Sequence, residues 1–454
     1  MRRIYFWMLS AEIRQIRVIR VLFLLCSPAI SILMGNILFT VTPAAGHMNP
    51  TIPIALALQA RGHDVRYFTG LGKIALLERI GLPATPILRG RADTPEQLMH
   101  PVGADRDSYN PLQIHHEVRY FLRLIEDGLA EMEALIAEWP PDLVVTDFST
   151  PIGVALAQRN RLRWVTTCTV PSCIRTRSGT PIFLGGLSKP RHAGHRLRDW
   201  GGRQLHEALR AGLTLALRDQ WRKLGIRLNL PDDGDGLYSP YAILGLAPYE
   251  LEYPRPDWPQ QLHWVGPIDW SDAAGLDEAS QAFLAQDAPK VFLTFGSEWF
   301  PAKERMLRTI CNTLNEMGVR TVVTGGGAVD LTDLRLPNVR LIPYAPYRST
   351  LERVDAVIHH GGCGITYSAL QAGRPALIVP DGKDQPDNAQ KVVEVGAGLR
   401  LGQRAVTPAR LRAAVMRLLH EHYFHAAAQQ MAQKLADYNP IPNSVAIIER
   451  VLAT

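Results

Sequence analysis

Residues 355–366 read Asp355-Ala-Val-Ile-His-His-Gly-Gly-Cys-Gly-Ile-Thr366. An apolar stretch runs directly into a glycine-rich turn, and a helical pattern then begins near Ile365 and ends at Gly373. A strand that enters a helix through such a turn is typical of a doubly wound α/β fold. Its small residues let the backbone approach a ligand, and the free N–H groups of the first helical turn favour an anion. The stretch therefore predicts a phosphate or diphosphate site with His360 at its edge. The alternative is a turn whose glycines serve packing alone.

The same alternation of apolar stretches and helical patterns continues on both sides of this turn. Toward the C-terminus, strand-like stretches begin at Lys290, Arg320, Val339 and Pro375. In the N-terminal half they cover residues 37–41, 65–69, 142–147 and 164–170. Continuous apolar strands separated by helices are expected when a parallel sheet is buried on both faces. The sequence predicts an α/β protein with two doubly wound, Rossmann-like domains.

Length and composition fit two such domains. The chain has 454 residues, more than one ordinary core holds, and 46% of them are hydrophobic. Proline-rich sequence near Tyr253 marks a change of composition that is typical of a linker. We predict an N-terminal extension (1–33), a first domain (34–251), a linker (252–288) and a second domain with the C-terminal helices (289–454).

The extension is basic and ends in an apolar run. Residues 1–33 contain five arginines and one glutamate, so they account for +4 of the net charge of +6. The run from Val21 to Met34 is shorter than the roughly 20 residues of a membrane span. No small-x-small cleavage site follows it. Three interpretations remain open: a start codon placed too early, with translation beginning at Met34, a peripheral membrane contact, and a signal peptide. We expect a cytoplasmic protein, with membrane association through residues 1–33 as the alternative.

Charge and motifs exclude several classes of protein. The net charge outside the extension is only +2, which argues against a nucleic-acid partner. The five cysteines form no CxxC pair, so neither a disulfide framework nor a zinc ribbon is expected. The chain lacks GxGxxG and the P-loop signature, which argues against a dinucleotide dehydrogenase and a P-loop nucleoside triphosphatase.

The block from Tyr344 to Asn388 resembles the donor-binding signature of family 1 glycosyltransferases with the GT-B fold. In that signature an aromatic residue precedes a proline, and H-x-G-x-G, a strand closed by proline, an acid–glutamine pair and Asn-Ala follow. The matching segments here are Tyr344-Ala-Pro346, His360-Gly-Gly-Cys-Gly364, Pro375 to Pro380, Asp384-Gln385 and Asn388-Ala389. The resemblance extends from about Met34 to the C-terminus. It implies two Rossmann-like domains that face each other across a cleft, the first for the acceptor and the second for the nucleotide-sugar donor.

A second motif of this family is the G-H-x-x-P turn after the first strand, which is present here as Gly46-His-Met-Asn-Pro50. The resemblance implies that His47 is the general base for the acceptor hydroxyl, a role that suits the pKa of histidine. It also implies that Asp147, at the end of a later strand, orients and stabilises the imidazole. Taken alone, His47 could equally be a histidine of a tight turn.

The resemblance also implies a set of donor-binding residues: Ser297, Tyr344, His360, Gly362, Gly364, Ile365, Thr366, Asp384 and Gln385. The Phe295-Gly-Ser297 turn and the glycine-rich turn at residues 360–364 would meet the diphosphate. Asp384 and Gln385 would hold the sugar, although Asp384 could instead cap a helix. Tyr344 would stack on the nucleobase, or it could be a core aromatic. Because Ile365 replaces the family's hydroxyl residue, we expect backbone contacts there.

Ser368 stands where relatives that use UDP-glucose commonly carry a glutamate that grips both ribose hydroxyls. A serine cannot accept two hydroxyl protons as a carboxylate does. A deoxyribose has no 2′-hydroxyl, so the substitution favours a dTDP-deoxysugar donor such as dTDP-rhamnose over a UDP-hexose.

These features predict an inverting, metal-independent glycosyltransferase. The expected acceptor is a hydroxyl of a small apolar molecule, such as a lipid or a secondary metabolite. The nucleotide sugar is a co-substrate, and no cofactor is expected. Two alternatives keep the fold and change the function: a catalytically silent homologue that binds a partner enzyme, and a sugar-nucleotide epimerase.

Overall fold

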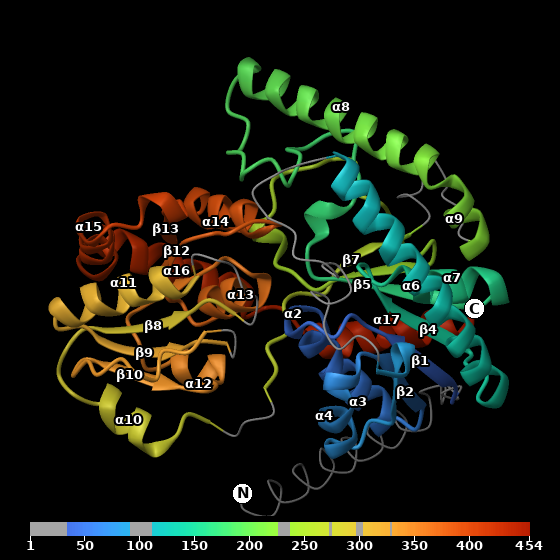
Figure 1. Ribbon diagram of the computed structural model, residues 1–454, viewed down its shortest axis with the longest axis horizontal. Coiled ribbons are helices and arrows are strands. Elements are labelled where there is room, and N and C mark those ends of the chain that lie inside the picture. The colour runs from blue at the N-terminus through green and yellow to red at the C-terminus, as the bar shows by residue number, and fades with distance from the viewer. Residues whose placement is uncertain (1–33, 91–110, 226–236, 272–274, 297–302, 327–328) are drawn as a thin grey trace, which may run out of the picture.

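Two parallel sheets, one in each half of the chain, form the framework of the molecule (Figure 1). The computed structural model describes residues 34–90, 111–225, 237–271, 275–296, 303–326 and 329–454. The predicted extension (1–33) and Ser297 lie outside these residues. The predicted α/β class with two doubly wound halves is confirmed.

The first sheet has the strand order β3-β2-β1-β4-β5-β6-β7, and its neighbouring strands are parallel. Its strands are β1 (Asn36–Thr40), β2 (Asp64–Thr69), β3 (Ala84–Pro86), β4 (Leu143–Asp147), β5 (Arg163–Cys168), β6 (Ala242–Gly245) and β7 (Leu262–Trp264). The order reverses between β1 and β4. In open α/β sheets, ligands bind beyond the carboxyl ends of the strands at such a switch point.

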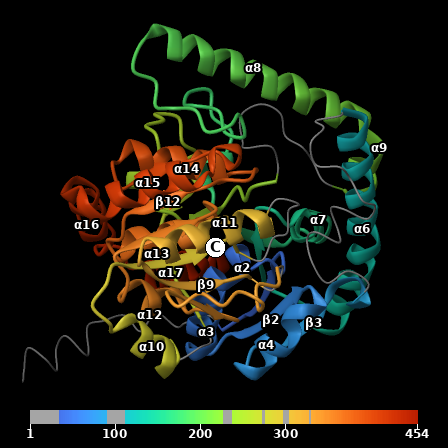
Figure 2. The ribbon, with the colours of Figure 1, turned by 60° about the vertical axis from the view of Figure 1, so that its left-hand side comes forward.

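Helices cover the first sheet because its strands are apolar on both faces. Ile37 and Phe39 of β1 belong to one buried cluster, whereas Leu38, on the opposite face, belongs to another. The helices of the first half are α2 (Ala45–Met48), α3 (Ile52–Ala60), α4 (Ile74–Arg79), α6 (Pro111–Glu138), α7 (Pro151–Asn160), α8 (Ala193–Ala216) and α9 (Arg218–Leu224). Gly62 follows α3 with a φ of +98°, so it ends that helix in the left-handed region that favours glycine. Figure 2 shows the long α8 lying along the outside of the molecule.

The second sheet repeats this plan with the order β10-β9-β8-β11-β12-β13, again parallel and reversing between β8 and β11. Its strands are β8 (Lys290–Thr294), β9 (Arg320–Thr324), β10 (Val339–Ile342), β11 (Ala356–His359), β12 (Ala376–Ile378) and β13 (Gly398–Arg400). The helices are α10 (Glu278–Leu284), α11 (Lys303–Glu316), α12 (Tyr347–Leu351), α13 (Cys363–Gln371), α14 (Gln385–Glu394), α15 (Pro408–His420) and α16 (His422–Leu435).

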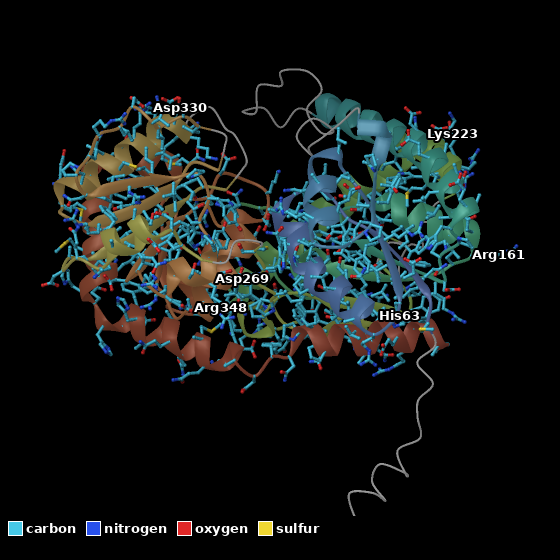
Figure 3. All side chains as sticks on the ribbon, turned by 90° about the horizontal axis from the view of Figure 1, so that it is seen from below. His63, Arg161, Lys223, Asp269, Asp330 and Arg348 are labelled. Atoms are coloured by element: carbon cyan, nitrogen blue, oxygen red, sulfur yellow. The ribbon has the colours of Figure 1, made fainter. Side chains whose placement is uncertain are left out.

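The last helix, α17 (Pro440–Ala453), crosses back to the first half. It packs on α3 and β5, and its Ile448 and Leu452 share a buried cluster with β1 (Figures 1 and 3). This corrects the predicted assignment of all the C-terminal helices to the second domain. The predicted linker (252–288) also contains two ordered elements, β7 in the first sheet and α10, which packs against β9. An apolar face can be buried against either half, so sequence periodicity alone does not place it.

Buried polar contacts join the two halves. Lys391 of α14 forms a salt bridge with Glu252 at 2.6 Å and donates to the Ser172 hydroxyl at 2.9 Å. The backbone N–H of Phe183 donates to Asp387 of α14 at 2.8 Å. The first half is thereby fixed against α14, the helix that follows the predicted sugar-binding residue Asp384.

Candidate active site

His47 and Asp147 lie 100 residues apart in the chain and meet at the switch point of the first sheet. His47 is in α2, directly after β1, and Asp147 is the last residue of β4. Nδ1 of His47 is 2.9 Å from Oδ1 of Asp147. The Asp147 side chain is fully buried, whereas that of His47 is 26% exposed. With Nδ1 held by the carboxylate, Nε2 is the ring atom that can accept a proton from a ligand.

Ser149 belongs to this arrangement and was not predicted from the sequence. Its backbone N–H donates to Oδ1 of Asp147 at 3.0 Å, and its hydroxyl donates to the same oxygen. The hydroxyl also lies 3.3 Å from Nδ1 of His47 and 2.8 Å from the Thr42 hydroxyl. These contacts hold the carboxylate in place. The sequence signal, Asp-x-Ser after a strand, is also that of an ordinary turn. The sequence therefore could not distinguish a serine that only forms a turn from one that holds the Asp147 carboxylate.

The surroundings raise the pKa of His47 above its usual 6.5. Burial lowers this pKa, but the charge of Asp147 and the hydrogen bond to it more than offset the burial. Of two neighbouring charges in the second half, Asp384 raises the His47 pKa and Lys383 lowers it, so His47 lies within electrostatic reach of this segment. An imidazole paired with a buried carboxylate is suited to take up a proton.

The predicted anion site lies at the switch point of the second sheet. Gly362 is the N-cap of α13, and the first helical bond runs from the Thr366 N–H to the Gly362 carbonyl at 3.1 Å. The N–H groups of Cys363, Gly364 and Ile365 therefore have no partner within the helix. They are the ones available to an anion. Gly364 adds no side chain that would cover them.

The His360 ring lies between Gly362, at the start of α13, and Gly296, which follows β8. A Cβ on Gly362 would lie 2.5 Å from Nε2 of its ring, and one on Gly296 would lie 2.9 Å from Cε1. Gly296 also has a φ of +61°, in the left-handed region. Glycine is thus favoured at Gly296 by its backbone conformation, and at Gly362 a side chain would have to displace the His360 ring. Ser297, the residue predicted to meet the diphosphate from this side, lies outside the described residues.

Ile365 and Thr366 point into the protein. They are 1% and 0% exposed, and Ile365 packs with Phe292 and Leu351 in a buried cluster. Burial of both side chains leaves only the backbone at these positions for a ligand, as the sequence predicts for Ile365.

Lys303 is a second residue that sequence reasoning missed. It begins α11, is 0% exposed, and donates from Nζ to the Gly296 carbonyl at 2.8 Å. A buried ammonium group therefore lies directly beside the Phe-Gly-Ser turn. A lysine at the start of a helix is ordinarily a surface residue, so nothing in the local sequence marks it.

Asp384 and Gln385 lie beside the glycine turn. Asp384 accepts from Nδ2 of Asn388 at 2.8 Å and from Sγ of Cys363 at 3.3 Å. It makes no cap hydrogen bond to α14, contrary to the alternative considered for it. Oε1 of Gln385 accepts the Asp381 backbone N–H at 2.9 Å, so this amide contributes its N–H2 group to any ligand.

Tyr344 is 52% exposed, which excludes a core position for its ring. Its hydroxyl donates to the hydroxyl of Ser271 at 2.9 Å. The bond ties the Tyr344 side chain to the segment that joins the two halves.

Within the described ranges, no group of three or more histidine, cysteine, aspartate or glutamate side chains is placed to hold a metal ion. None of the helices that the structure describes is both long enough and apolar enough to cross a bilayer.

Known proteins resemble both the second half and the whole chain. Residues 311–452 match the family model for the C-terminal domain of erythromycin biosynthesis protein CIII-like proteins. The chain is 27% identical to 4'-demethylrebeccamycin synthase of Lentzea aerocolonigenes over 436 residues, 91% of this chain and 99% of that protein. It is 26% identical over 464 residues to aclacinomycin-T 2-deoxy-L-fucose transferase of Streptomyces galilaeus, with 92% and 96% covered.

Among solved structures, the glycosyltransferase VinC in complex with dTDP is similar to this chain with a TM-score of 0.65 and 22% identity. The match covers 92% of this chain and 99% of that one. Together with the two parallel sheets, these findings show a glycosyltransferase with the GT-B fold.

Proposed function

We propose that the protein transfers a sugar, with inversion, from a nucleotide diphosphate sugar to a hydroxyl of a small apolar acceptor. The observation that carries this proposal is the 2.9 Å contact between His47 and a buried Asp147, close enough to the second half for Asp384 to shift the His47 pKa. His47 takes the acceptor proton on Nε2 while the acceptor oxygen bonds to the anomeric carbon. The bond from that carbon to the diphosphate breaks on the opposite face.

The departing diphosphate gains negative charge, and the second half offers positive partners for it. These are the free N–H groups at the start of α13, His360 between the two glycine turns, and Lys303 beneath Gly296. Preorganised donors of this kind stabilise developing charge without reorganisation. Asp384 and Gln385 hold the transferred sugar, and Tyr344 stacks on the nucleobase.

We propose that these groups suffice without a metal ion. The initial rate of transfer should therefore be unchanged after treatment with EDTA. The measurement is product formation with and without the chelator, followed by addition of Mg²⁺ or Mn²⁺. A rate that disappears with EDTA and returns with either ion would contradict this proposal.

The proposed donor is a dTDP-deoxysugar, with dTDP-rhamnose first and a UDP-hexose second. Ser368 is 5% exposed and carries no carboxylate to hold a ribose 2′-hydroxyl. A relative named as a 2-deoxy-L-fucose transferase and a structural neighbour solved with dTDP support the same choice. The proposed acceptor is a secondary metabolite, as the names of the relatives suggest.

A nucleotide comparison tests this donor proposal. An unpaired 2′-hydroxyl at a buried position costs about 1–3 kcal/mol, so dTDP should bind roughly 5- to 150-fold more tightly than UDP. Calorimetric Kd values for dTDP, UDP and GDP measure the difference. Tighter binding of UDP would overturn the deoxyribose proposal alone. Failure of every nucleotide to bind would count against the transferase itself and favour a silent homologue.

A further inference from the structure

The segment 265–271 runs between the two halves, and its residues 268–271 contact both. Ile268 and Trp270 pack against the core cluster of the first half. Ser271 bonds to Tyr344 of the second half. In an extended chain successive side chains point to opposite sides. Asp269, between Ile268 and Trp270, is therefore directed toward the second half.

Two hydrogen bonds fix this segment beside α13. Nε2 of Gln371 donates to the Pro267 carbonyl at 3.4 Å, and the Tyr344 hydroxyl donates to Ser271 at 2.9 Å. The first bond involves the C-terminal end of α13. The second involves Tyr344, the ring of which is proposed to stack on the nucleobase. The segment therefore lies between the C-terminal end of α13 and Tyr344.

The Asp269 carboxylate belongs to this segment and lies next to Ser368 of α13, whose hydroxyl hydrogen-bonds to it. Its pKa is raised by burial among the neighbouring groups, while the Ser368 hydroxyl and the charge of Arg348 lower it. Figure 3 shows Asp269 and Arg348 together on the side of the second half that faces the first. Although neighbouring groups surround the carboxylate, Asp269 keeps solvent-exposed surface, so a ligand can reach it.

We propose that Asp269 accepts a hydrogen bond from the 3′-hydroxyl of the donor's deoxyribose. This inference rests on the proposed function, which places the nucleobase on Tyr344 and the diphosphate at the start of α13. The nucleoside sugar then lies beside Ser368, where a carboxylate is the strongest available acceptor. A deoxyribose 5′-diphosphate has one free hydroxyl, and a carboxylate that already receives Ser368 retains an oxygen for it.

The proposal is tested by removing the two partners separately and together. Kd values are measured by calorimetry for dTDP and for 2′,3′-dideoxythymidine 5′-diphosphate, with the wild type and with Asp269→Ala. Since hydrogen bonds to a charged group are the stronger kind, loss of the 3′-hydroxyl should weaken binding to the wild type about 10- to 100-fold. The same loss should have almost no effect on Asp269→Ala.

The comparison also separates this role from general effects of charge. Asp269 repels a diphosphate at long range, but this effect is the same for both ligands and cancels in the ratio of their Kd values. An equal ratio for wild type and Asp269→Ala would overturn the proposal. Asp269→Asn, which keeps an oxygen acceptor, should give a ratio between those of wild type and Asp269→Ala.

Asp330→Ala is the matched control, since Asp330 lies on an exposed loop far from Asp269 (Figure 3). Its Kd ratio should equal that of the wild type. Failure of the wild type to bind dTDP would count against the proposed function. Tight binding of dTDP with no coupling to Asp269 would count against this inference alone.

Discussion

Replacement of His47 by alanine is expected to lower the rate of transfer by about 10²–10⁴-fold, the usual range for loss of a general base. Nucleotide binding should be almost unchanged, because His47 belongs to the first half and contacts Asp147 rather than the glycine turn. The measurements are kcat for sugar transfer and the Kd of dTDP. His420→Ala, an exposed histidine at the end of α15, is the control and should behave like the wild type.

A pH profile shows whether the histidine acts as the base. Only the neutral imidazole accepts a proton, so kcat/KM should rise with pH through the pKa of His47, which Asp147 holds above 6.5. Asp147→Asn removes the charge that raises this pKa. The rising limb should then move to lower pH, and the maximal rate should fall. A His47→Ala rate equal to that of the wild type would exclude His47 from the mechanism.

Replacement of Lys391 by methionine is expected to destabilise the protein by about 3–5 kcal/mol, the typical cost of leaving one buried charge unpaired. Lys391 and Glu252 are 5% and 2% exposed and 2.6 Å apart. Methionine matches the length of the lysine but leaves the Glu252 carboxylate without its cation. Urea unfolding of the full chain measures the loss.

Two further variants make this expectation specific. Lys391→Met combined with Glu252→Gln should recover much of the loss, because no buried charge is then unpaired. Arg191→Ala breaks a second salt bridge to α14, with Glu394, but its arginine is 70% exposed. Exposed pairs contribute little, so its unfolding curve should stay near that of the wild type. Equal curves for Lys391→Met and Arg191→Ala would contradict the importance of the buried pair.

The sequence predicted those parts of the fold that local patterns encode. The apolar stretch from residue 37 and the stretch before His360 became β1 and β11, because a short run that is apolar on both faces is typical of a covered parallel strand. Gly62 and Gly373 end their helices with positive φ, as expected of glycine at that place. Ser149, Lys303 and Asp269 were missed because their local sequence is that of a turn, a surface helix and a linker.

Tertiary structure decided which distant residues meet. The sequence alone determined the alternation of strands and helices in both halves, the glycine turn and the G-H-x-x-P turn, since each depends on neighbours within a few residues. The 2.9 Å pairing of His47 with Asp147 depends instead on the order β1–β4 in the sheet, and that order results from packing across the whole half. The crossing of α17, the buried Lys391–Glu252 pair and the orientation of Asp269 arise in the same way. An apolar face or a charge specifies what kind of partner it needs, and only the folded chain determines which partner lies within reach.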